Sequence, residues 1–193
     1  MDIILASTSP YRRRLLERLQ LPFRCVPPAT EERPFPGEKP GALAGRLALE
    51  KARAVATKEP RAIVIGSDQV GSLGGVILEK PGSHPVAREQ LRASSGRTVC
   101  FWTGLAVVCR ARELELCHTE PFSVHFRDLG DSAIDDYLAR EQPFDCAGSF
   151  KWEGLGIALF EKLQGNDPTS LEGLPLITLT TLLRQAGIDI LAC

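Results

Sequence analysis

The chain lacks an excess of charge of either sign, because 23 Lys and Arg residues face 24 Asp and Glu residues and the formal net charge is -1. Binding to bulk nucleic acid or to an anionic membrane needs a broad basic surface. The sequence also lacks a long apolar run, and a segment such as residues 103–109 is far too short to span a bilayer. We therefore expect neither a nucleic acid polymer nor a membrane as partner, while a local basic pocket is compatible with this balance.

Ligand pairs and targeting signals are missing as well. No Cys-x-x-Cys pair occurs, and the three histidines have no zinc-ligand spacing relative to the cysteines. A Walker-type Gly-x-x-x-x-Gly-Lys-Ser/Thr loop is absent, which excludes the P-loop class. No basic segment and long apolar segment precede Ile3, so we expect no secretion signal and a cytoplasmic protein. Several cysteines lie in apolar runs, which suits reduced thiols; the six are Cys25, Cys100, Cys109, Cys117, Cys146 and Cys193.

Strand-like and helix-like segments follow one another without internal repeats. The length of 193 residues suits one domain or two small lobes. The patterns predict strands over residues 2–6, 62–69, 98–109, 114–125 and 145–150, and a hairpin over 70–78. They predict helices over residues 11–20, 42–58, 85–94, 131–140 and 175–186. These periodicities indicate an α/β or α+β fold.

One stretch is central to the expected site: the apolar residues 62–65 run without alternation into Gly66 and then into Ser67, Asp68 and Gln69. Such a run is typical of a strand that is covered on both faces. In open α/β sheets, ligands lie beyond the carboxyl ends of the strands, which makes Asp68 the first catalytic candidate. The alternative is that Asp68 serves only a turn, where Asp and Ser are common.

A second expected feature is an anion site at the start of the first helix. Ser9 suits the N-cap, and Pro10 suits the first helical position. Helical spacing places Arg12 on the same face as the leucines of that helix. Free N–H groups, serines and arginines at a helix N-terminus can hold phosphate. The alternative for Arg12 and Arg13 is a solvated basic helix end.

Lys51 is the residue that fits its surroundings least. It lies in the middle of the apolar stripe of the helix predicted over residues 42–58. A lysine there must extend to solvent or meet an anion, and we favour a role in the site. The preceding residues 22–41 are rich in Pro, Gly and charge and predict a long loop near that site.

Several separated motifs, in the same order, resemble the Maf family of nucleoside triphosphate pyrophosphatases over essentially the whole chain. They are residues 5–13, Glu32, Lys51-Ala52, residues 66–69, Lys80-Pro81, Ser95-Gly96, residues 146–151 and Glu153-Gly154. The resemblance implies a mixed α/β fold like that of inosine triphosphate pyrophosphatase. In that fold a twisted mixed sheet is flanked by helices, and one domain over residues 1–193 forms two lobes around a cleft.

The resemblance also implies a reaction, the hydrolysis of the bond between the α- and β-phosphates with help from a divalent metal such as Mg²⁺, Mn²⁺ or Co²⁺. It marks Asp68 as the proton acceptor for the attacking water and, together with Glu32, as a metal ligand. Fixed cations and N–H donors must hold the triphosphate. The residues expected to do so are Ser7, Ser9, Arg12, Arg13, Lys51, Lys80 and Lys151.

Three positions make the chain most similar to the 7-methyl-GTP branch of the family: Tyr11, Gln69 and Glu153. A 7-methylguanine ring is cationic, so an aromatic face and a carboxylate both attract it. Tyr11 replaces the tryptophan expected of that branch, and Glu79 stands where a glycine usually precedes the lysine. The alternatives are a dTTP/UTP or other noncanonical nucleotide pyrophosphatase, or a non-catalytic nucleotide-binding regulator of cell division. The sequence leaves open whether the chain forms a homodimer.

Overall fold

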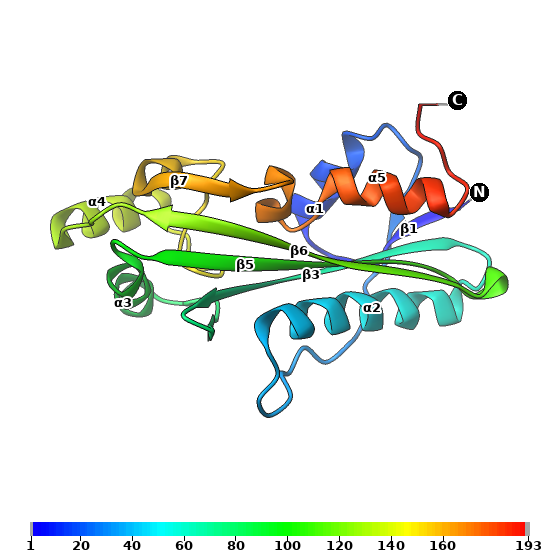
Figure 1. Ribbon diagram of the computed structural model, residues 1–193, viewed down its shortest axis with the longest axis horizontal. Coiled ribbons are helices and arrows are strands. Elements are labelled where there is room, and N and C mark those ends of the chain that lie inside the picture. The colour runs from blue at the N-terminus through cyan, green and yellow to red at the C-terminus, as the bar shows by residue number, and fades with distance from the viewer. Residues whose placement is uncertain (1, 192–193) are drawn as a thin grey trace. The chain divides into compact units, whose positions relative to one another are not determined.

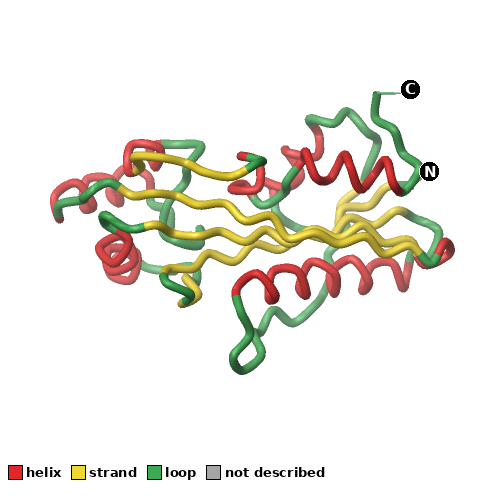
Figure 2. The backbone as a smooth tube through the Cα atoms, in the orientation of Figure 1, coloured by secondary structure: helices red, strands yellow, loops and turns green. Residues whose placement is uncertain are grey.

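The computed structural model describes residues 2–191 and has a mixed α/β fold with one seven-stranded sheet (Figure 1, Figure 2). The strands are β1 (Ile3–Leu5), β2 (Arg24–Cys25), β3 (Ile63–Leu73), β4 (Val76–Leu78), β5 (Thr98–Cys109), β6 (Leu114–Phe126) and β7 (Phe160–Gly165). The α-helices are α1 (Pro10–Glu17), α2 (Pro40–Lys58), α3 (His84–Ser94), α4 (Asp131–Glu141) and α5 (Leu176–Gln185). Three short 3₁₀ helices are η1 (Arg110–Arg112), η2 (Leu155–Leu159) and η3 (Pro168–Glu172).

The sheet is mixed, as predicted. Its strand order is β2-β1-β3-β5-β6-β7, and β4 pairs with β3. β1 runs parallel to both β2 and β3, whereas the β3–β4 and β6–β7 pairs are antiparallel. The predicted hairpin turns at Gly74 and Gly75, and both have positive φ.

The chain divides into two compact units, which are described separately. The first unit contains the residues up to 69, residues 102–120 and the residues from 166 onward. The second unit contains residues 70–101 and 121–165. The arrangement of two lobes around one cleft stays a prediction.

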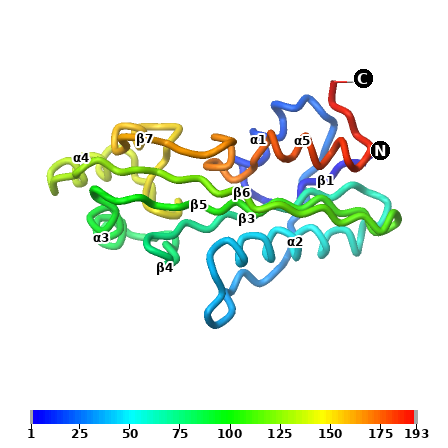
Figure 3. Tube along the Cα trace, viewed as in Figure 1, coloured from blue at the N-terminus to red at the C-terminus, as the bar shows by residue number. Residues whose placement is uncertain are grey.

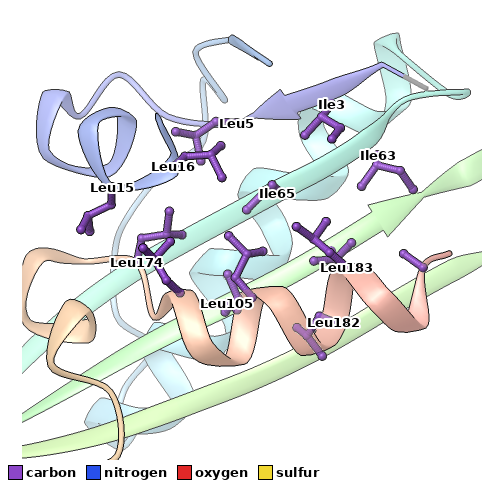
Figure 4. Packing of buried hydrophobic residues seen from close by; sticks show 14 of the residues in the cluster. Ile3, Leu5, Leu15, Leu16, Ile63, Ile65, Leu105, Leu174, Leu182 and Leu183 are labelled. Carbon is purple, nitrogen blue, oxygen red and sulfur yellow. The ribbon is translucent and has the colours of Figure 1, made fainter. Parts of the chain in front are cut away.

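The first unit has a core on each face of its strands. One core joins odd-numbered residues of β1 and β3 to α1 and α5, two helices from opposite ends of the sequence that lie on the same face (Figure 3, Figure 4). Its largest fully buried members are Leu5, Leu15, Leu16, Ile63, Ile65, Leu105, Leu174 and Leu179. The other core joins even-numbered strand residues to α2, namely Ile4, Ala6, Val64, Ala106 and Val108 with Ala48, Ala52, Val55 and Ala56. The strands are therefore covered on both faces, as the unalternating apolar run predicts.

Small residues let α2 lie unusually close to these strands. A Cβ added to Gly66 would lie 2.2 Å from the carbonyl oxygen of Ala48, and one added to Gly104 would lie 2.0 Å from that of Ala44. Both distances are too short for real atoms, so only glycine fits where the helix backbone meets β3 and β5.

The second unit has its own aromatic core. Phe101, Phe126, Phe150 and Phe160 meet edge to face, with ring centroids between 4.8 and 5.6 Å apart. Beside it, α3 and α4 are joined by ion pairs from Arg88 and Arg92 to the carboxylates of α4.

The strand predicted over residues 145–150 is wrong. These residues form turns, because Gly148 and Ser149 have φ values of +79° and +63° that are incompatible with an extended chain. The sequence patterns missed β2 and β7, whose residues are mostly polar and exposed at the ends of the strand order. α1 also ends earlier than predicted, at Glu17.

Within residues 2–191, no helix is both long enough and apolar enough to cross a bilayer. The five cysteines in the same range are free thiols. Cys193 lies outside the described residues.

Candidate active site

A buried lysine held between two carboxylates is the centre of the site. The side chain of Lys51 is only 5% exposed, and its Nζ lies 2.5 Å from Asp68 Oδ1 and 2.5 Å from Glu32 Oε1. Asp68 is nearly as buried as the lysine, while Glu32 is more than half exposed. The lysine on the apolar stripe of α2 therefore meets anions and does not extend into solvent.

Side chains alternate between the two faces of β3, so neighbouring residues contact different partners. Asp68 lies on the same face as Val64 and Gly66 and points toward α2, whereas Ser67 and Gln69 point toward η3 and the residue after it. The alternative that Asp68 serves a turn is wrong, because β3 continues to Leu73. The expectation that the strand ends at this point is wrong for the same reason, so Asp68 is presented from the middle of a long strand.

Arg12 adds a second cation to this cluster. Its Nε donates a hydrogen bond of 2.8 Å to the carbonyl oxygen of Gly173. Burial lowers the pKa of Arg12, and the negative charges of Asp68 and Glu32 act in the opposite direction. A guanidinium stays charged under any physiological condition, so the site contains two fixed cations beside two carboxylates.

The start of α1 is capped as predicted. The Ser9 side chain accepts a hydrogen bond from the Arg12 N–H at 3.4 Å, and Pro10 occupies the first helical position. The Ser7 hydroxyl accepts from the Ser9 N–H at 3.1 Å. Arg13, by contrast, is exposed and pairs with Glu17 at 3.0 Å. The structure thus places Arg13 at a solvated helix end, and Tyr11 lies half-buried at the same helix start.

Gln69 is oriented by backbone carbonyl groups of η3. Its Nε2 donates to the carbonyl oxygens of Ser170 at 2.6 Å and Leu171 at 3.1 Å, and it lies 3.3 Å from Thr103 Oγ1. Thr103 donates to the same Ser170 oxygen at 2.9 Å. Carbonyl oxygens only accept, so the amide nitrogen must face them. Within residues 2–191, Gln69 Oε1 accepts no hydrogen bond and is the end of the amide that a ligand can use.

The turn after η3 holds several of these groups at once. The Gly173 carbonyl oxygen accepts from Arg12 and, at 2.8 Å, from the buried Ser67 hydroxyl. Asp167, which is 1% exposed, fixes η3 by accepting from the Thr169 N–H at 2.9 Å and the Ile177 N–H at 2.7 Å. Sequence reasoning gave these residues no part in the site. The only local signal was the Asp-Pro-Thr cap of that helix.

The second unit presents the remaining predicted residues, Lys80, Lys151 and Glu153. Lys80 and Glu153 are exposed, and Lys151 is half-buried, with its Nζ 3.9 Å from Asp145. Gln90, which sequence reasoning did not select, links the segments of the two lysines. Its Nε2 donates to the Glu79 carbonyl oxygen at 2.9 Å, and its Oε1 accepts from the Ser149 hydroxyl at 2.5 Å.

The donor set around Lys51 suits a hard divalent cation. Both carboxylates touch the same ammonium nitrogen, so their oxygens are separated by no more than twice that contact distance. Mg²⁺ and Mn²⁺ bind oxygen and often use one or two protein carboxylates, with phosphates and water as the other ligands. No group of three or more His, Cys, Asp or Glu side chains in residues 2–191 is arranged as a metal site. The pair that could hold such an ion together with phosphate and water is Asp68 and Glu32.

Comparison with known proteins identifies the family. A family model described as Maf-like protein matches residues 2–186. This chain belongs to the Maf-like family. The resemblance seen in its motifs is confirmed, and the Maf-like model spans nearly all of the described residues.

Curated relatives of this Maf-like chain are similar over almost its full length. A protein of Nitrosococcus oceani is 56% identical and covers 98% of this chain and 95% of its own. A Polaromonas protein is 53% identical over 98% of this chain and 87% of its own. A Colwellia psychrerythraea protein is 50% identical over 98% and 95%. All three are named 7-methyl-GTP pyrophosphatase.

A solved structure supports the fold alone. The structure of a HAM1 protein from Coxiella burnetii aligns with a TM-score of 0.51 at 16% identity. It covers 96% of this chain and 99% of its own. The mixed α/β fold predicted for the Maf-like chain is confirmed.

Proposed function

We propose that this chain is a nucleoside triphosphate pyrophosphatase that hydrolyses the α–β phosphate bond of 7-methyl-GTP to 7-methyl-GMP and diphosphate. The observation that carries the proposal is the buried Lys51 ammonium between Asp68 and Glu32. Arg12 is close enough to interact electrostatically with both carboxylates. The names of the three curated relatives support this choice of nucleotide.

The cations of the site complement the negative charge of the substrate. A triphosphate carries about four negative charges near neutral pH, and fixed cations and N–H donors stabilise that charge as the bond breaks. Lys51 and Arg12 supply the cations, while Ser7, Ser9 and the N-terminus of α1 supply hydroxyl and N–H groups. Arg13, Lys80 and Lys151 are exposed or half-buried, and each stays a predicted phosphate contact.

Asp68 is the group that takes a proton from the attacking water. Its contact with Lys51 fixes the direction of Oδ1 and leaves Oδ2 for the water. Glu32 and Asp68 would also hold a divalent cation such as Mg²⁺, Mn²⁺ or Co²⁺, which would neutralise phosphate charge.

Three residues would select the base. Tyr11 offers an aromatic face and Glu153 a carboxylate, and both attract the cationic 7-methylguanine ring. Gln69 presents Oε1, a hydrogen-bond acceptor, because its amide nitrogen is bound by η3. This orientation suits the ring N–H and amino donors of guanine.

The test is pyrophosphate release from a panel of 7-methyl-GTP, GTP, dTTP, UTP, CTP and ITP, with Mg²⁺ or Mn²⁺ present. We expect a preference for 7-methyl-GTP and a loss of about 10²- to 10⁴-fold in turnover for Asp68→Asn, with nucleotide binding retained. Unchanged turnover in this variant would exclude Asp68 as the base. Preference for dTTP or UTP would reject the 7-methyl-GTP assignment but keep the reaction.

A double variant tests which residues select the base. Glu153→Gln combined with Gln69→Thr should weaken turnover of 7-methyl-GTP much more than turnover of pyrimidine triphosphates. Equal losses on both would show that these residues do not select the base.

The free thiols of the described cysteines suit a reducing compartment, and we place the enzyme in the cytoplasm.

A further inference from the structure

We infer that Arg46 is a positioning residue that holds the loop carrying Glu32 against α2. This loop, residues 26–39, is called the Glu32 loop below. Among the described residues, the hydrogen bonds, ion pairs and ring contact of Arg46 are with the loop and with α2 itself, and none is with Asp68, Lys51 or Glu32. The kinetic part of this inference rests on the proposed pyrophosphatase function.

The main contact is a two-pronged ion pair between Arg46 and Glu38. Arg46 Nε and Nη2 each donate to one Glu38 carboxylate oxygen at 2.7 Å. The hydrogen bonds from Arg46 lower the pKa of Glu38 to about 2. Glu38 is only 9% exposed and Arg46 20%, so this pair is better shielded from solvent than an ordinary surface ion pair.

Arg46 contacts the loop at two further points. Its Nη2 also donates to the carbonyl oxygen of Arg33 at 3.0 Å, and its guanidinium lies 4.0 Å from the centroid of the Phe35 ring. The Phe35 N–H donates to Glu38 at 3.0 Å. Arg46 thus holds the loop from the residue directly after Glu32 to Glu38, and its guanidinium lies over one side of a phenylalanine ring that is 59% exposed.

The Glu32 loop has little else to hold it. Among the described residues, positions 27–34 make no backbone–backbone hydrogen bond. Ala29 has a φ of +50°, a conformation that an alanine keeps only under constraint from its surroundings. Glu32 is itself more than half exposed and contacts Lys51 through its carboxylate. Without Arg46, little would keep that carboxylate beside the lysine.

The helix α2 offers a matched control. Arg53 lies two turns further along the same helix and pairs with Glu115 through two hydrogen bonds of 2.8 and 2.6 Å. It is 54% exposed, and among the described residues its side-chain hydrogen bonds go to Glu115 and not to the Glu32 loop. Arg53→Gln therefore removes a two-pronged ion pair from α2, a more exposed one, and leaves the loop in place.

The experiment compares wild type, Arg46→Gln, Arg46→Lys and Arg53→Gln in hydrogen exchange and in turnover. We expect faster exchange of the Phe35 and Glu38 amides, which are hydrogen-bonded within the loop, in Arg46→Gln and not in Arg53→Gln. We also expect kcat in Arg46→Gln to be lower by about 10²-fold, because a misplacement near 1 Å costs about that much. The KM for nucleotide should change little. Arg46→Lys, which keeps the charge but loses the planar fork, should recover part of the loss.

A second comparison asks whether Arg46 acts through Glu32. In a Glu32→Gln background, Arg46→Gln should lower kcat only a few-fold, because the group that it positions is already lost. The full 10²-fold effect in that background would overturn the inference. Wild-type exchange in Arg46→Gln, or faster exchange with unchanged turnover, would also overturn it.

Failure of the proposed function has a different signature. If wild type and Arg53→Gln release no pyrophosphate from any nucleotide, the proposed function fails, while the exchange data still decide whether Arg46 holds the loop. If Arg46→Gln does not fold, Glu38→Gln removes the same pair from the loop side. Glu38→Gln must then reproduce the faster exchange and lower kcat, or the inference fails.

Discussion

Removing the charge of Lys51 should destabilise the protein strongly, even though its replacement is apolar and the site is buried. The variant is Lys51→Met, which keeps most of the side-chain volume. It leaves Asp68 buried, at 9% side-chain exposure, without the ammonium that lies 2.5 Å from its oxygen. Breaking a buried ion pair by removing one partner costs about 3–5 kcal/mol, because the other charge stays desolvated.

The contribution of Glu32 to this cost is small. Glu32 lies at the same distance from Lys51, but it is 58% exposed and can turn into water when the lysine is gone. An exposed pair contributes about 0–1 kcal/mol. The cost of Lys51→Met is therefore dominated by Asp68, and we expect the free energy of unfolding to fall by about 3 kcal/mol.

Urea unfolding followed by tryptophan fluorescence measures this value. With a slope of about 1–3 kcal/mol per molar urea, the midpoint should fall by about 1–3 M. Arg53→Gln, which breaks an exposed pair, should move it much less. The double variant Lys51→Met/Asp68→Leu replaces both charges by apolar groups and should recover most of the loss. A wild-type midpoint for Lys51→Met, or a double variant as unstable as the single one, would refute the reasoning.

Two further predictions concern the packing of α2 and the loss of stability at low pH. Gly66→Ala should destabilise by at least about 1–3 kcal/mol, because its Cβ would meet backbone atoms of α2 at 2.2 and 2.8 Å. An added Cβ at Gly130 would meet nothing within 4 Å, so Gly130→Ala should cost only about 0.5–1 kcal/mol, for a poorer N-cap of α4. Similar costs for both variants in the same urea assay would contradict the packing argument. The pKa of Glu38 falls from an ordinary 4.5 to about 2, so its contribution to stability is complete above pH 4.5 and is lost as the pH drops toward 2. The stability difference between wild type and Arg46→Gln should therefore shrink over that pH range, and a constant difference would show that the pair adds no pH-dependent stability.

The parts of the site that could be predicted from sequence are those with a local pattern. An apolar run that ends in polar residues marked β3 and Asp68, and a lysine on an apolar stripe marked the buried position of Lys51. A serine followed by proline marked the cap of α1. These signals depend on residues within one element, so the periodicity of helix or strand is enough to find them.

Contacts made by backbone atoms over long separations left no such pattern. Arg12 and Gly173 are 161 positions apart, and the acceptor on Gly173 is a carbonyl oxygen that any residue could offer. The same holds for the η3 carbonyl groups that orient Gln69. The mispredicted strand over residues 145–150 fails for a related reason. Its composition is compatible with a strand, and only the left-handed conformations of Gly148 and Ser149 rule one out.

The position of two charged residues on one rigid helix has a consequence for sequence change. Arg46 and Lys51 lie five residues apart on α2, a rise of about 7.5 Å, and the backbone of that helix is pressed against Gly66 and Gly104. The helix therefore acts as a spacer of fixed length. Residues added to or removed from the Glu32 loop can be absorbed by its irregular backbone. A single residue inserted between Arg46 and Lys51 would turn one of them by about 100° and separate the two ends of the spacer.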